Sequence, residues 1–210
     1  MAQANPGANP DKPTVMVLGS IGHGKSTFLN KLAGQDGLFK AGRDVKGVTQ
    51  DPICHEMEHF NLIDTPGLND ARIPTVDWVQ RFNTNSAVQP QPLSLVMMLF
   101  RCSSRPSVDD QSVLLICKNA IAKLAPANCV LIFTHCDEDD EMDLEYAEEW
   151  YNVGMTSDPG LPSMSQDRIF LFRGKTGQGG DETTNEEIKN WIKSKLPPVE
   201  QRAETKHVDY

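Results

Sequence analysis

The feature that most constrains the fold of this chain is a glycine-rich segment near its N-terminus with the form G-x-x-x-x-G-K-S. The segment spans 19–26, reads Gly-Ser-Ile-Gly-His-Gly-Lys-Ser, and lies between an apolar run at 15–18 and helical spacing at 27–32. A strand, such a loop and a helix in this order form a phosphate-binding loop, because backbone N–H groups and the helix N-terminus bind phosphate oxygens. A chance glycine-rich turn is the alternative, which the flanking strand and helix disfavour. We therefore predict a nucleoside triphosphate site.

The residues of this loop have separate expected roles. We expect Lys25 to reach the β- and γ-phosphates of the nucleotide and the Ser26 hydroxyl to bind Mg²⁺. Glycine lets the backbone N–H groups converge on phosphate oxygens, since it has no Cβ. The remaining expected nucleotide contacts in this segment are Ser20, Gly22, His23, Gly24 and Thr27.

Beyond this loop, apolar runs alternate with helical patterns, which is typical of a mostly parallel sheet covered by helices on both faces. We therefore predict an α/β fold, and 210 residues suit one domain with a full core. The expected strands are 14–19, 55–63, 94–101, 128–134 and 168–172. The expected helices are 25–33, 74–83, 108–124, 143–151 and 185–195.

Charge and composition restrict the partners. The net charge is −9, and residues 137–149 contain nine acidic residues and no basic ones. A solvent-exposed helix face explains such a run, and a partner-binding or dimer-steering patch is the alternative. This acidity argues against nucleic acid as a partner. No apolar run approaches the roughly 18 residues of a membrane span, and we expect neither a signal peptide nor an N-myristoyl or prenyl group. We expect no membrane anchor, a cytoplasmic location, and five cysteines as free thiols.

A second motif, Asp-Thr-Pro-Gly at 64–67, ends the apolar pattern at 59–63. A carboxylate at this strand end can hold Mg²⁺, so we expect Asp64 to bind the metal, often through water. We expect the backbone N–H of Gly67 to approach the γ-phosphate, which requires the absence of a Cβ. Alone, D-x-x-G is usually just a turn, but its order after the phosphate-binding loop favours a functional interpretation.

The loop before this motif contains Gly-Val-Thr at 47–49. The hydroxyl of Thr49 can complete the Mg²⁺ shell only when a γ-phosphate is present, which makes the loop a switch. An ordinary surface-loop threonine is the alternative.

A third motif, Thr-His-Cys-Asp at 134–137, ends another apolar run. The carboxylate of Asp137 can accept two hydrogen bonds from guanine, whereas adenine offers no such pair of donors. We expect Thr134 and His135 to lie beside the base. Many G proteins have N-K-x-D here, so base affinity is expected to be modest. The alternatives are that Asp139 recognises the base, or that Asp137 only begins the acidic segment.

The order of these motifs resembles the septin-related GTPases of the AIG/GIMAP (immune-associated nucleotide-binding) family, with the chloroplast Toc GTPases as relatives. The resemblance covers about 15–196. Its segments are 19–27, 47–49, 64–70, 133–137 and 105–110, the last resembling the family's R-[FY]-T-x-E-D block. It implies a P-loop G domain that binds GTP and GDP with Mg²⁺ and hydrolyses GTP. The loop that follows the last strand, with Gly174 and Lys175, is expected to close over the base.

Two residues shape the expected hydrolysis. Many small GTPases have glutamine after the D-x-x-G glycine, which orients the attacking water, but this chain has Leu68. Intrinsic hydrolysis is therefore expected to be slow. The resemblance implies a homodimer across the nucleotide faces, in which Arg105 reaches the partner's phosphates; Arg101 is the competing candidate. Locally, Ser107 and Asp110 are expected to form a capping box.

Three functions fit this pattern to different degrees. The first is a GTP-hydrolysing switch that dimerises when loaded, and the second is a GTP-gated assembly scaffold with negligible hydrolysis. The third, an ATP-dependent small-molecule kinase, needs an arginine-bearing lid that 138–167 does not supply. The expected organisation is a disordered lead at 1–13, a GTPase domain at 14–196 and a polar tail at 197–210.

Overall fold

The central feature of the computed structural model is one six-stranded sheet, with strand order β2-β3-β1-β4-β5-β6. The described residues are 9, 11–40, 51–68, 77–78, 93–103, 105–120, 128–136, 142–154, 163–173 and 181–195. The strands are β1 Thr14–Leu18, β2 Ile53–Glu56, β3 Asn61–Asp64, β4 Leu93–Arg101, β5 Cys129–Thr134 and β6 Ile169–Leu171. Only β2 pairs antiparallel with its neighbour, and the other pairs are parallel. The predicted mostly parallel sheet is confirmed.

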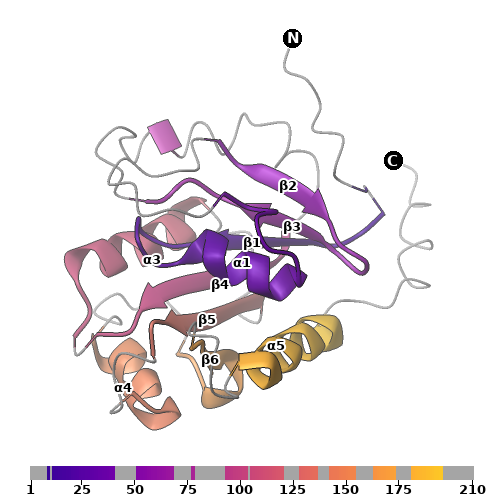
Figure 1. Ribbon diagram of the computed structural model, residues 1–210. Helices are drawn as coiled ribbons and strands as arrows, with labels where there is room; N and C mark the ends of the chain where they lie inside the picture. Colours follow the sequence, from indigo (N-terminus) through magenta and orange to yellow (C-terminus); the bar gives the residue numbers. More distant parts are fainter. Residues whose placement is uncertain are drawn as a thin grey trace, which may run out of the picture.

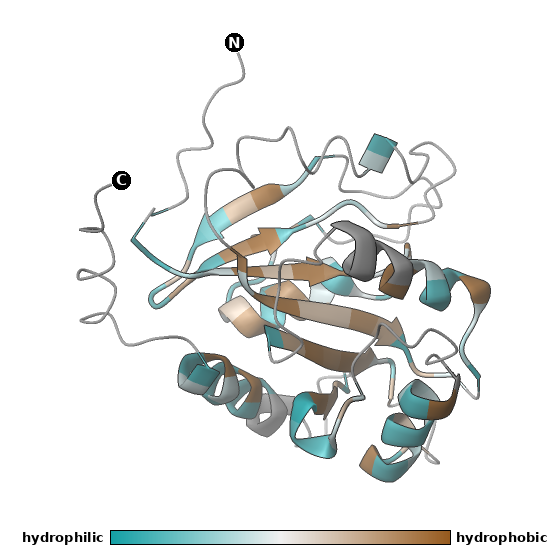
Figure 2. Ribbon diagram, turned by 180° about the vertical axis from the view of Figure 1, so that it is seen from behind, coloured by the Kyte–Doolittle hydropathy of each residue, from teal (hydrophilic) through white to brown (hydrophobic). Residues whose placement is uncertain are grey.

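Helices cover both faces of this sheet (Figure 1). They are α1 Lys25–Ala33, α3 Val108–Ala120, α4 Leu144–Gly154 and α5 Asp181–Lys195, with a short 3₁₀ turn η2 at Gln166–Arg168. One apolar cluster joins α1 and α5 to one sheet face, through Phe28 and Ile188 among others. The other joins α3 and α4 to the opposite face, through Val113 and Trp150. Figure 2 shows the apolar residues concentrated on the strands between these helix layers.

One expected strand was wrong. The stretch predicted as a single strand at 55–63 is two antiparallel strands, β2 and β3, joined by a tight reversal. The backbone N–H of Met57 donates to the carbonyl of Phe60 at 2.8 Å, and this bond closes the turn. The turn sequence Met-Glu-His-Phe contains none of the Gly, Pro, Asn or Asp residues that usually mark a reversal. The local sequence therefore gave no signal that the chain reverses here.

The remaining elements differ from expectation mainly at their ends. α5 begins at Asp181, four residues before the predicted start at 185, and α4 continues to Gly154. In the predicted helix at 74–83, only 77–78 are described, and they are helical. Residues 1–8, 10, 121–124 and 197–210 lie outside the described part of the chain, so the expected tail stays a prediction. Residues 9 and 11–13 of the expected lead are described: Asn9 N–H donates to Oδ1 of Asn61 on β3, and Lys12 donates to Glu56 on β2, so this end of the lead is held against the sheet.

Two composition-based expectations can be checked in the described residues. Among the described cysteines, Cys54, Cys102, Cys129 and Cys136 form no disulfide. Burial raises the pKa of the Cys54 and Cys129 thiols to about 11, so both are protonated at neutral pH. In the acidic segment, α4 exposes Glu145 and Glu149 to solvent, as a solvated helix face would. No helix among the described residues has the length and apolar character needed to cross a bilayer.

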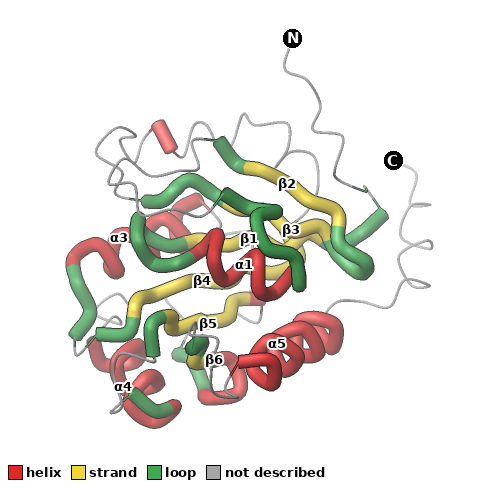
Figure 3. The backbone as a smooth tube through the Cα atoms, in the orientation of Figure 1, coloured by secondary structure: helices red, strands yellow, loops and turns green. Residues whose placement is uncertain are grey.

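The sheet topology brings the predicted motifs to one place. β1, β4 and β5 are adjacent and parallel, so their carboxyl ends meet at the same edge. In open α/β sheets, ligands bind in the crevice outside the carboxyl ends of the strands. The loop after β1 leads into α1 and the loop after β4 leads into α3 (Figure 3).

Candidate nucleotide-binding site

The phosphate-binding loop connects β1 to α1 and has the backbone shape that the motif predicts. Gly22 and Gly24 have φ angles of 80° and 74°, in the left-handed region that residues with a Cβ rarely adopt. Gly24 is the N-cap of α1, makes no side-chain capping bond, and is followed by no acidic residue in the first turn. The positive end of the α1 dipole is therefore not neutralised by its own first turn, which suits an anion.

The ammonium group of Lys25 lies over this loop. Its Nζ donates to the carbonyls of Gly19 at 2.9 Å and Ser20 at 3.1 Å, and the side chain is buried. Burial lowers the Lys25 pKa to about 8, and the charge of Asp64 partly opposes this effect. A buried cation held by two carbonyls has lost its water and gains from a nearby anion. Lys25 is thus placed and charged to receive a phosphate.

Ser26 and Asp64, which are 38 residues apart, meet at the start of α1. The Ser26 hydroxyl donates to Oδ2 of Asp64 at 3.0 Å, and Asp64 is buried at the end of β3. The hydroxyl of the next residue, Thr65, donates to the Val17 carbonyl at 2.7 Å and ties this strand end to β1. A hydroxyl and a carboxylate oxygen are suitable ligands for Mg²⁺, which prefers oxygen.

This pair does not form a complete metal centre by itself. Among the described residues, no group of three or more His, Cys, Asp or Glu side chains could hold a metal ion. Mg²⁺ often binds through one or two protein groups together with substrate phosphates and water. The oxygen donors at Ser26 and Asp64 fit that mode, in which a nucleotide supplies the other ligands. Their role as metal ligands stays a prediction.

The Asp-Thr-Pro-Gly turn packs directly against the phosphate-binding loop. A Cβ on Gly67 would lie 2.5 Å from Cγ1 of Ile21, closer than real contacts allow. Two backbone hydrogen bonds join the segments: Ile21 N–H donates to the Leu68 carbonyl, and Leu68 N–H donates to the Gly19 carbonyl, each at 3.1 Å. Glycine at 67 is therefore required by close packing. Its expected contact with the γ-phosphate stays a prediction.

A buried tryptophan holds the other side of this turn. The indole N–H of Trp78 donates to the Pro66 carbonyl at 3.1 Å, and Trp78 is almost fully buried. Leu68, the residue after the glycine, is also buried in the core. No local pattern indicates the Trp78 contact, because it depends on how 77–78 packs against the turn.

The end of β5 meets the same loop from the opposite side. The Thr134 hydroxyl lies 2.9 Å from the His23 carbonyl and 3.2 Å from the Phe100 carbonyl. His135 has a φ of 61°, and its Cε1 would lie 3.4 Å from a Cβ on Gly24. The structure thus brings Thr134 and His135 beside the phosphate-binding loop. Their expected contact with a base stays a prediction.

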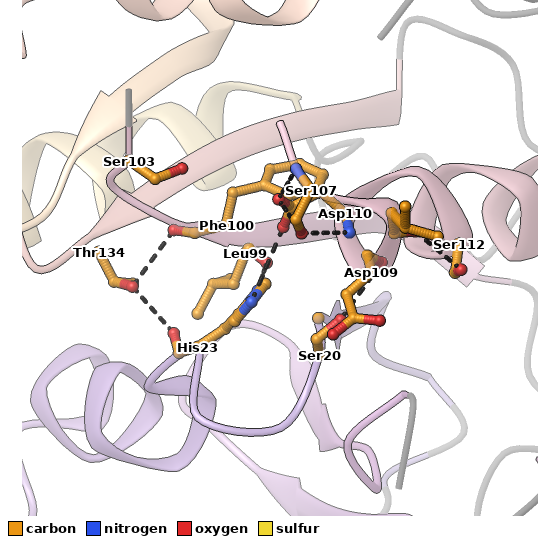
Figure 4. Close-up of polar contacts among 12 residues, drawn as sticks. Ser20, His23, Leu99, Phe100, Ser103, Ser107, Asp109, Asp110, Ser112 and Thr134 are labelled. Atoms are coloured by element: carbon orange, nitrogen blue, oxygen red, sulfur yellow. Dashed lines mark hydrogen bonds and ion pairs between the residues drawn. The ribbon is translucent and has the colours of Figure 1, made fainter. Parts of the chain in front are cut away.

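The first turn of α3 completes the surroundings of the loop (Figure 4). Nδ1 of His23 lies 3.0 Å from the Leu99 carbonyl, and Nε2 lies 3.7 Å from Oδ1 of Asp110. Burial lowers the His23 pKa, while the Leu99 hydrogen bond and Asp110 oppose this effect. The Ser20 hydroxyl lies 3.4 Å from the Asp109 carbonyl, to which it donates. The sequence did not predict these contacts between the loop and α3.

The segment 105–110 has the local structure that its sequence predicts. Ser107 N–H donates to Oδ2 of Asp110 at 2.7 Å, and Asp110 N–H donates to the Ser107 hydroxyl at 3.2 Å. This reciprocal pair confirms the expected capping box. Arg105, just before the helix, is exposed, and its carbonyl accepts from the Ser103 hydroxyl at 3.0 Å. Arg101, at the end of β4, is also exposed.

Five residues with predicted functional roles are not among those that the structure describes. Thr49, Asp137, Asp139, Gly174 and Lys175 lie outside the described residues. Their expected roles, in the Mg²⁺ shell and in base recognition, stay predictions. The described site therefore consists of the phosphate-binding loop, the 64–68 turn, the end of β5 and the first turn of α3.

Comparison with solved structures supports the fold. Toc33 from Arabidopsis thaliana in complex with GDP and Mg²⁺ matches with a TM-score of 0.63 and 18% identity, covering 89% of this chain and 85% of that one. Era in complex with MgGDPNP and a segment of 16S ribosomal RNA matches with a TM-score of 0.58 and 16% identity, covering 89% and 57%. At identities this low, the two structural matches show a shared G-domain fold.

Sequence relatives are also GTPases or nucleotide-binding proteins. GTPase Der of Streptococcus thermophilus is 38% identical over 72 residues, which are 32% of this chain and 16% of that protein. Immune-associated nucleotide-binding protein 10 of Arabidopsis thaliana is 25% identical over 147 residues, covering 67% and 31%. This chain therefore spans less than a third of the length of either relative.

A family model settles the broader assignment. The model described as 50S ribosome-binding GTPase matches residues 14–135, which are more than half of the 210 residues. The match includes the phosphate-binding loop, the Asp-Thr-Pro-Gly turn and the end of β5. The predicted P-loop G-domain fold is confirmed, and the chain belongs to the 50S ribosome-binding GTPase family.

Proposed function

We propose that this chain is a Mg²⁺-dependent GTPase of the AIG/Toc type that hydrolyses GTP slowly alone and faster as a homodimer. The observation that carries the proposal is the hydrogen bond between Ser26 and Asp64, which lies next to the buried Lys25. These three groups come from the phosphate-binding loop and the β3 end, and together they suit a magnesium-bound triphosphate.

The nucleotide is held mainly by the loop and α1. Phosphate oxygens accept hydrogen bonds from the N–H groups of 22–27, and Lys25 neutralises part of their charge. Ser26 and Asp64 would hold Mg²⁺, Ser26 as a direct ligand and Asp64 directly or through water. Thr49 joins this shell in the GTP state. Mg²⁺ supplies charge neutralisation on the transferred phosphoryl group.

Guanine is recognised at the β5 end. The carboxylate of Asp137 accepts two hydrogen bonds from the guanine ring, while Thr134 and His135 lie beside the base. Gly174 and Lys175 cover its other edge. The positions of Thr134 and His135 beside Gly24 support this arrangement, since they bring the described end of β5 close to the phosphate-binding loop. A cytoplasmic location and the absence of nucleic-acid binding stay part of the proposal, although Era, with the same fold, was solved with RNA.

Slow intrinsic hydrolysis follows from the residue after Gly67. Leu68 is buried in the core and both its backbone groups are bonded to the phosphate-binding loop. An apolar, fixed side chain at this position cannot orient the attacking water by hydrogen bonding. Another group must therefore stabilise the transition state, and a positioned arginine can do so.

Arg105 is the proposed source of that charge, supplied across a dimer. It is exposed and lies just before α3, whose first turn contacts the phosphate-binding loop. A solved Toc33 structure carries an arginine-to-alanine mutation described as dimerisation-deficient, and another structure title states that dimerisation is important for GTPase activity of chloroplast translocon components. The resemblance of 105–110 to the family block assigns the same role to Arg105.

The test is GTP turnover across protein concentrations, for the parent, Arg105→Ala and the matched surface variant Arg101→Ala. We expect the specific activity of the parent to rise with concentration, and the rise to disappear in Arg105→Ala only. Loss in Arg101→Ala instead would assign the role to that arginine. A flat profile in the parent would refute dimer activation.

A GTP-gated scaffold with negligible hydrolysis is the second candidate, favoured by the buried Leu68. Light scattering with the non-hydrolysable analogue GMPPNP separates the two functions. Assembly with GMPPNP but no turnover at any concentration would support the scaffold. No calorimetric binding of GTP or GDP with Mg²⁺ would refute both.

A further inference from the structure

One residue of the site, His23, has a side chain with no role so far; its ring lies between the end of β4 and the first turn of α3. Among the described residues it touches three segments. Its Nδ1 lies 3.0 Å from the Leu99 carbonyl on β4, its Nε2 lies 3.7 Å from Asp110 on α3, and its carbonyl accepts from Thr134 on β5. Figure 4 shows this arrangement. A phosphate-binding loop needs only the backbone of this position, so the side chain is available for another role.

The partner on α3 is itself fixed. Asp110 is buried, and its Oδ2 accepts hydrogen bonds from both the N–H and the hydroxyl of Ser107, at 2.7 and 2.6 Å. Its other oxygen, Oδ1, makes no hydrogen bond and faces His23. A buried carboxylate oxygen without a hydrogen bond is costly. The capping box therefore holds Asp110 with this oxygen 3.7 Å from Nε2 of His23.

The protonation of His23 decides how strong this contact is. A carbonyl can only accept, so Nδ1 donates to Leu99, and in the neutral ring Nε2 then has a lone pair that faces the Asp110 carboxylate. A second proton on Nε2 converts this into a charge-assisted contact. The charged groups around the ring are Asp110 and Asp109 of α3, which favour that proton, and Lys25 of α1, which opposes it. Phosphate charge in the loop would act in the same direction as the two aspartates.

We propose that His23 is a positioning residue that transmits occupancy of the phosphate-binding loop to the first turn of α3, and thereby to Arg105. Nucleotide in the loop strengthens the contact between His23 and Asp110, which draws the first turn of α3 toward the loop. Arg105 lies two residues before Ser107, the capping residue of that turn, so its placement changes with the turn. The last step rests on the proposed function of Arg105, whereas the link between the loop and α3 does not.

The test is hydrogen exchange of the amides in the first turn of α3, with and without saturating GMPPNP and Mg²⁺. In the parent, we expect nucleotide to slow exchange at 110–112 by at least about fivefold, the lower end of coupling between sites. In His23→Asn, which keeps a donor near Leu99 but cannot reach Asp110, we expect less than about a twofold effect. His23→Gln places an uncharged donor near the position of Nε2 whether or not nucleotide is bound. It should therefore slow exchange relative to His23→Asn in both states, with a smaller nucleotide effect than in the parent.

A second pair of variants separates this link from helix capping. Asp110→Ala removes both the cap and the contact with His23, so nucleotide should no longer slow exchange. Ser107→Ala weakens the cap but leaves Asp110 facing His23. It should speed exchange in both states and keep the ratio between them. Each variant is measured at a nucleotide concentration that saturates it, so differences in affinity do not enter the ratio.

The outcomes separate this inference from the proposed function. If His23→Asn and Asp110→Ala keep the parent's ratio, or if the parent shows no nucleotide-linked slowing, the proposal is wrong. If the ratios change as expected but turnover depends neither on concentration nor on Arg105, the link to α3 holds and the role of Arg105 in trans is wrong. If both hold, His23→Asn should also lower the concentration-dependent rise in turnover.

Discussion

The contact between Gly67 and Ile21 allows a quantitative test of how the two nucleotide motifs are joined. In Gly67→Ala, the new methyl group would lie 2.5 Å from Cγ1, 3.0 Å from Cα and 3.1 Å from N of Ile21. The Cγ1 contact is about 1 Å shorter than ordinary carbon contacts. The two backbone contacts cannot relax easily, because Ile21 N–H is bonded to the Leu68 carbonyl. The segments must therefore move apart.

The expected cost follows from this crowding. Adding a methyl group to a well-packed site costs about 1–3 kcal/mol, so we expect Gly67→Ala to lower the free energy of unfolding by about 2 kcal/mol. For a chain of this size, 1 kcal/mol corresponds to about 2–4 °C, so Tm should fall by about 4–8 °C. The φ of Gly67 is outside the left-handed region, so the cost is steric and not conformational.

A double-mutant cycle isolates the steric term. Ile21→Ala removes Cγ1, so the double variant Ile21→Ala/Gly67→Ala should be more stable than the sum of the single effects by about 1 kcal/mol. Gly37→Ala is the control: it has a φ of 78° and nothing within 4 Å, so its cost should add to that of Ile21→Ala. Urea unfolding, monitored by circular dichroism, gives the free energy of unfolding of each variant. Additive effects of Ile21→Ala and Gly67→Ala, or an unchanged Tm in Gly67→Ala, would refute this description of the packing.

Three further predictions concern the segment after α1, the metal site and the pH dependence of stability. The Asn30 side chain donates to the Phe39 carbonyl at 2.8 Å and accepts from the Phe39 N–H at 2.7 Å. Asn30→Ala should therefore lower the free energy of unfolding by about 2 kcal/mol, measured by urea unfolding. A change below about 0.5 kcal/mol would show that these bonds contribute little. Ser26→Asn should weaken GMPPNP binding in the presence of Mg²⁺ by at least about tenfold, or about 1.4 kcal/mol, and should weaken GDP binding less. Calorimetry with and without EDTA measures both affinities, and an unaltered preference between GMPPNP and GDP would contradict the prediction. Burial lowers the His23 pKa, so the folded state binds fewer protons than the unfolded chain as the pH falls. The stability due to neutral His23 is therefore complete above about pH 6.5, the ordinary pKa of histidine, and is lost as the pH falls through the lowered pKa of the folded state. His23→Asn should flatten that part of the stability–pH profile, and an unchanged slope would argue against the burial effect.

Elements that depend on local spacing could be predicted from the amino-acid sequence alone. The phosphate-binding loop needs fixed positions for Gly24, Lys25 and Ser26 between a strand and a helix, and all three occur within one short segment. The capping box at 107–110 is local in the same way. The alternation of apolar strands and amphipathic helices also determined the parallel sheet, because each pattern has its own period.

Contacts between distant segments depend instead on the tertiary fold. The reversal at 57–60 lacks turn residues and forms because β2 pairs with β3. His23 reaches Leu99 and Thr134, which are 76 and 111 residues away, only because β1, β4 and β5 are neighbours whose carboxyl ends meet at one edge. The order of strands in a sheet depends on how the whole chain packs, so no local pattern around His23 could predict which side chains it would meet.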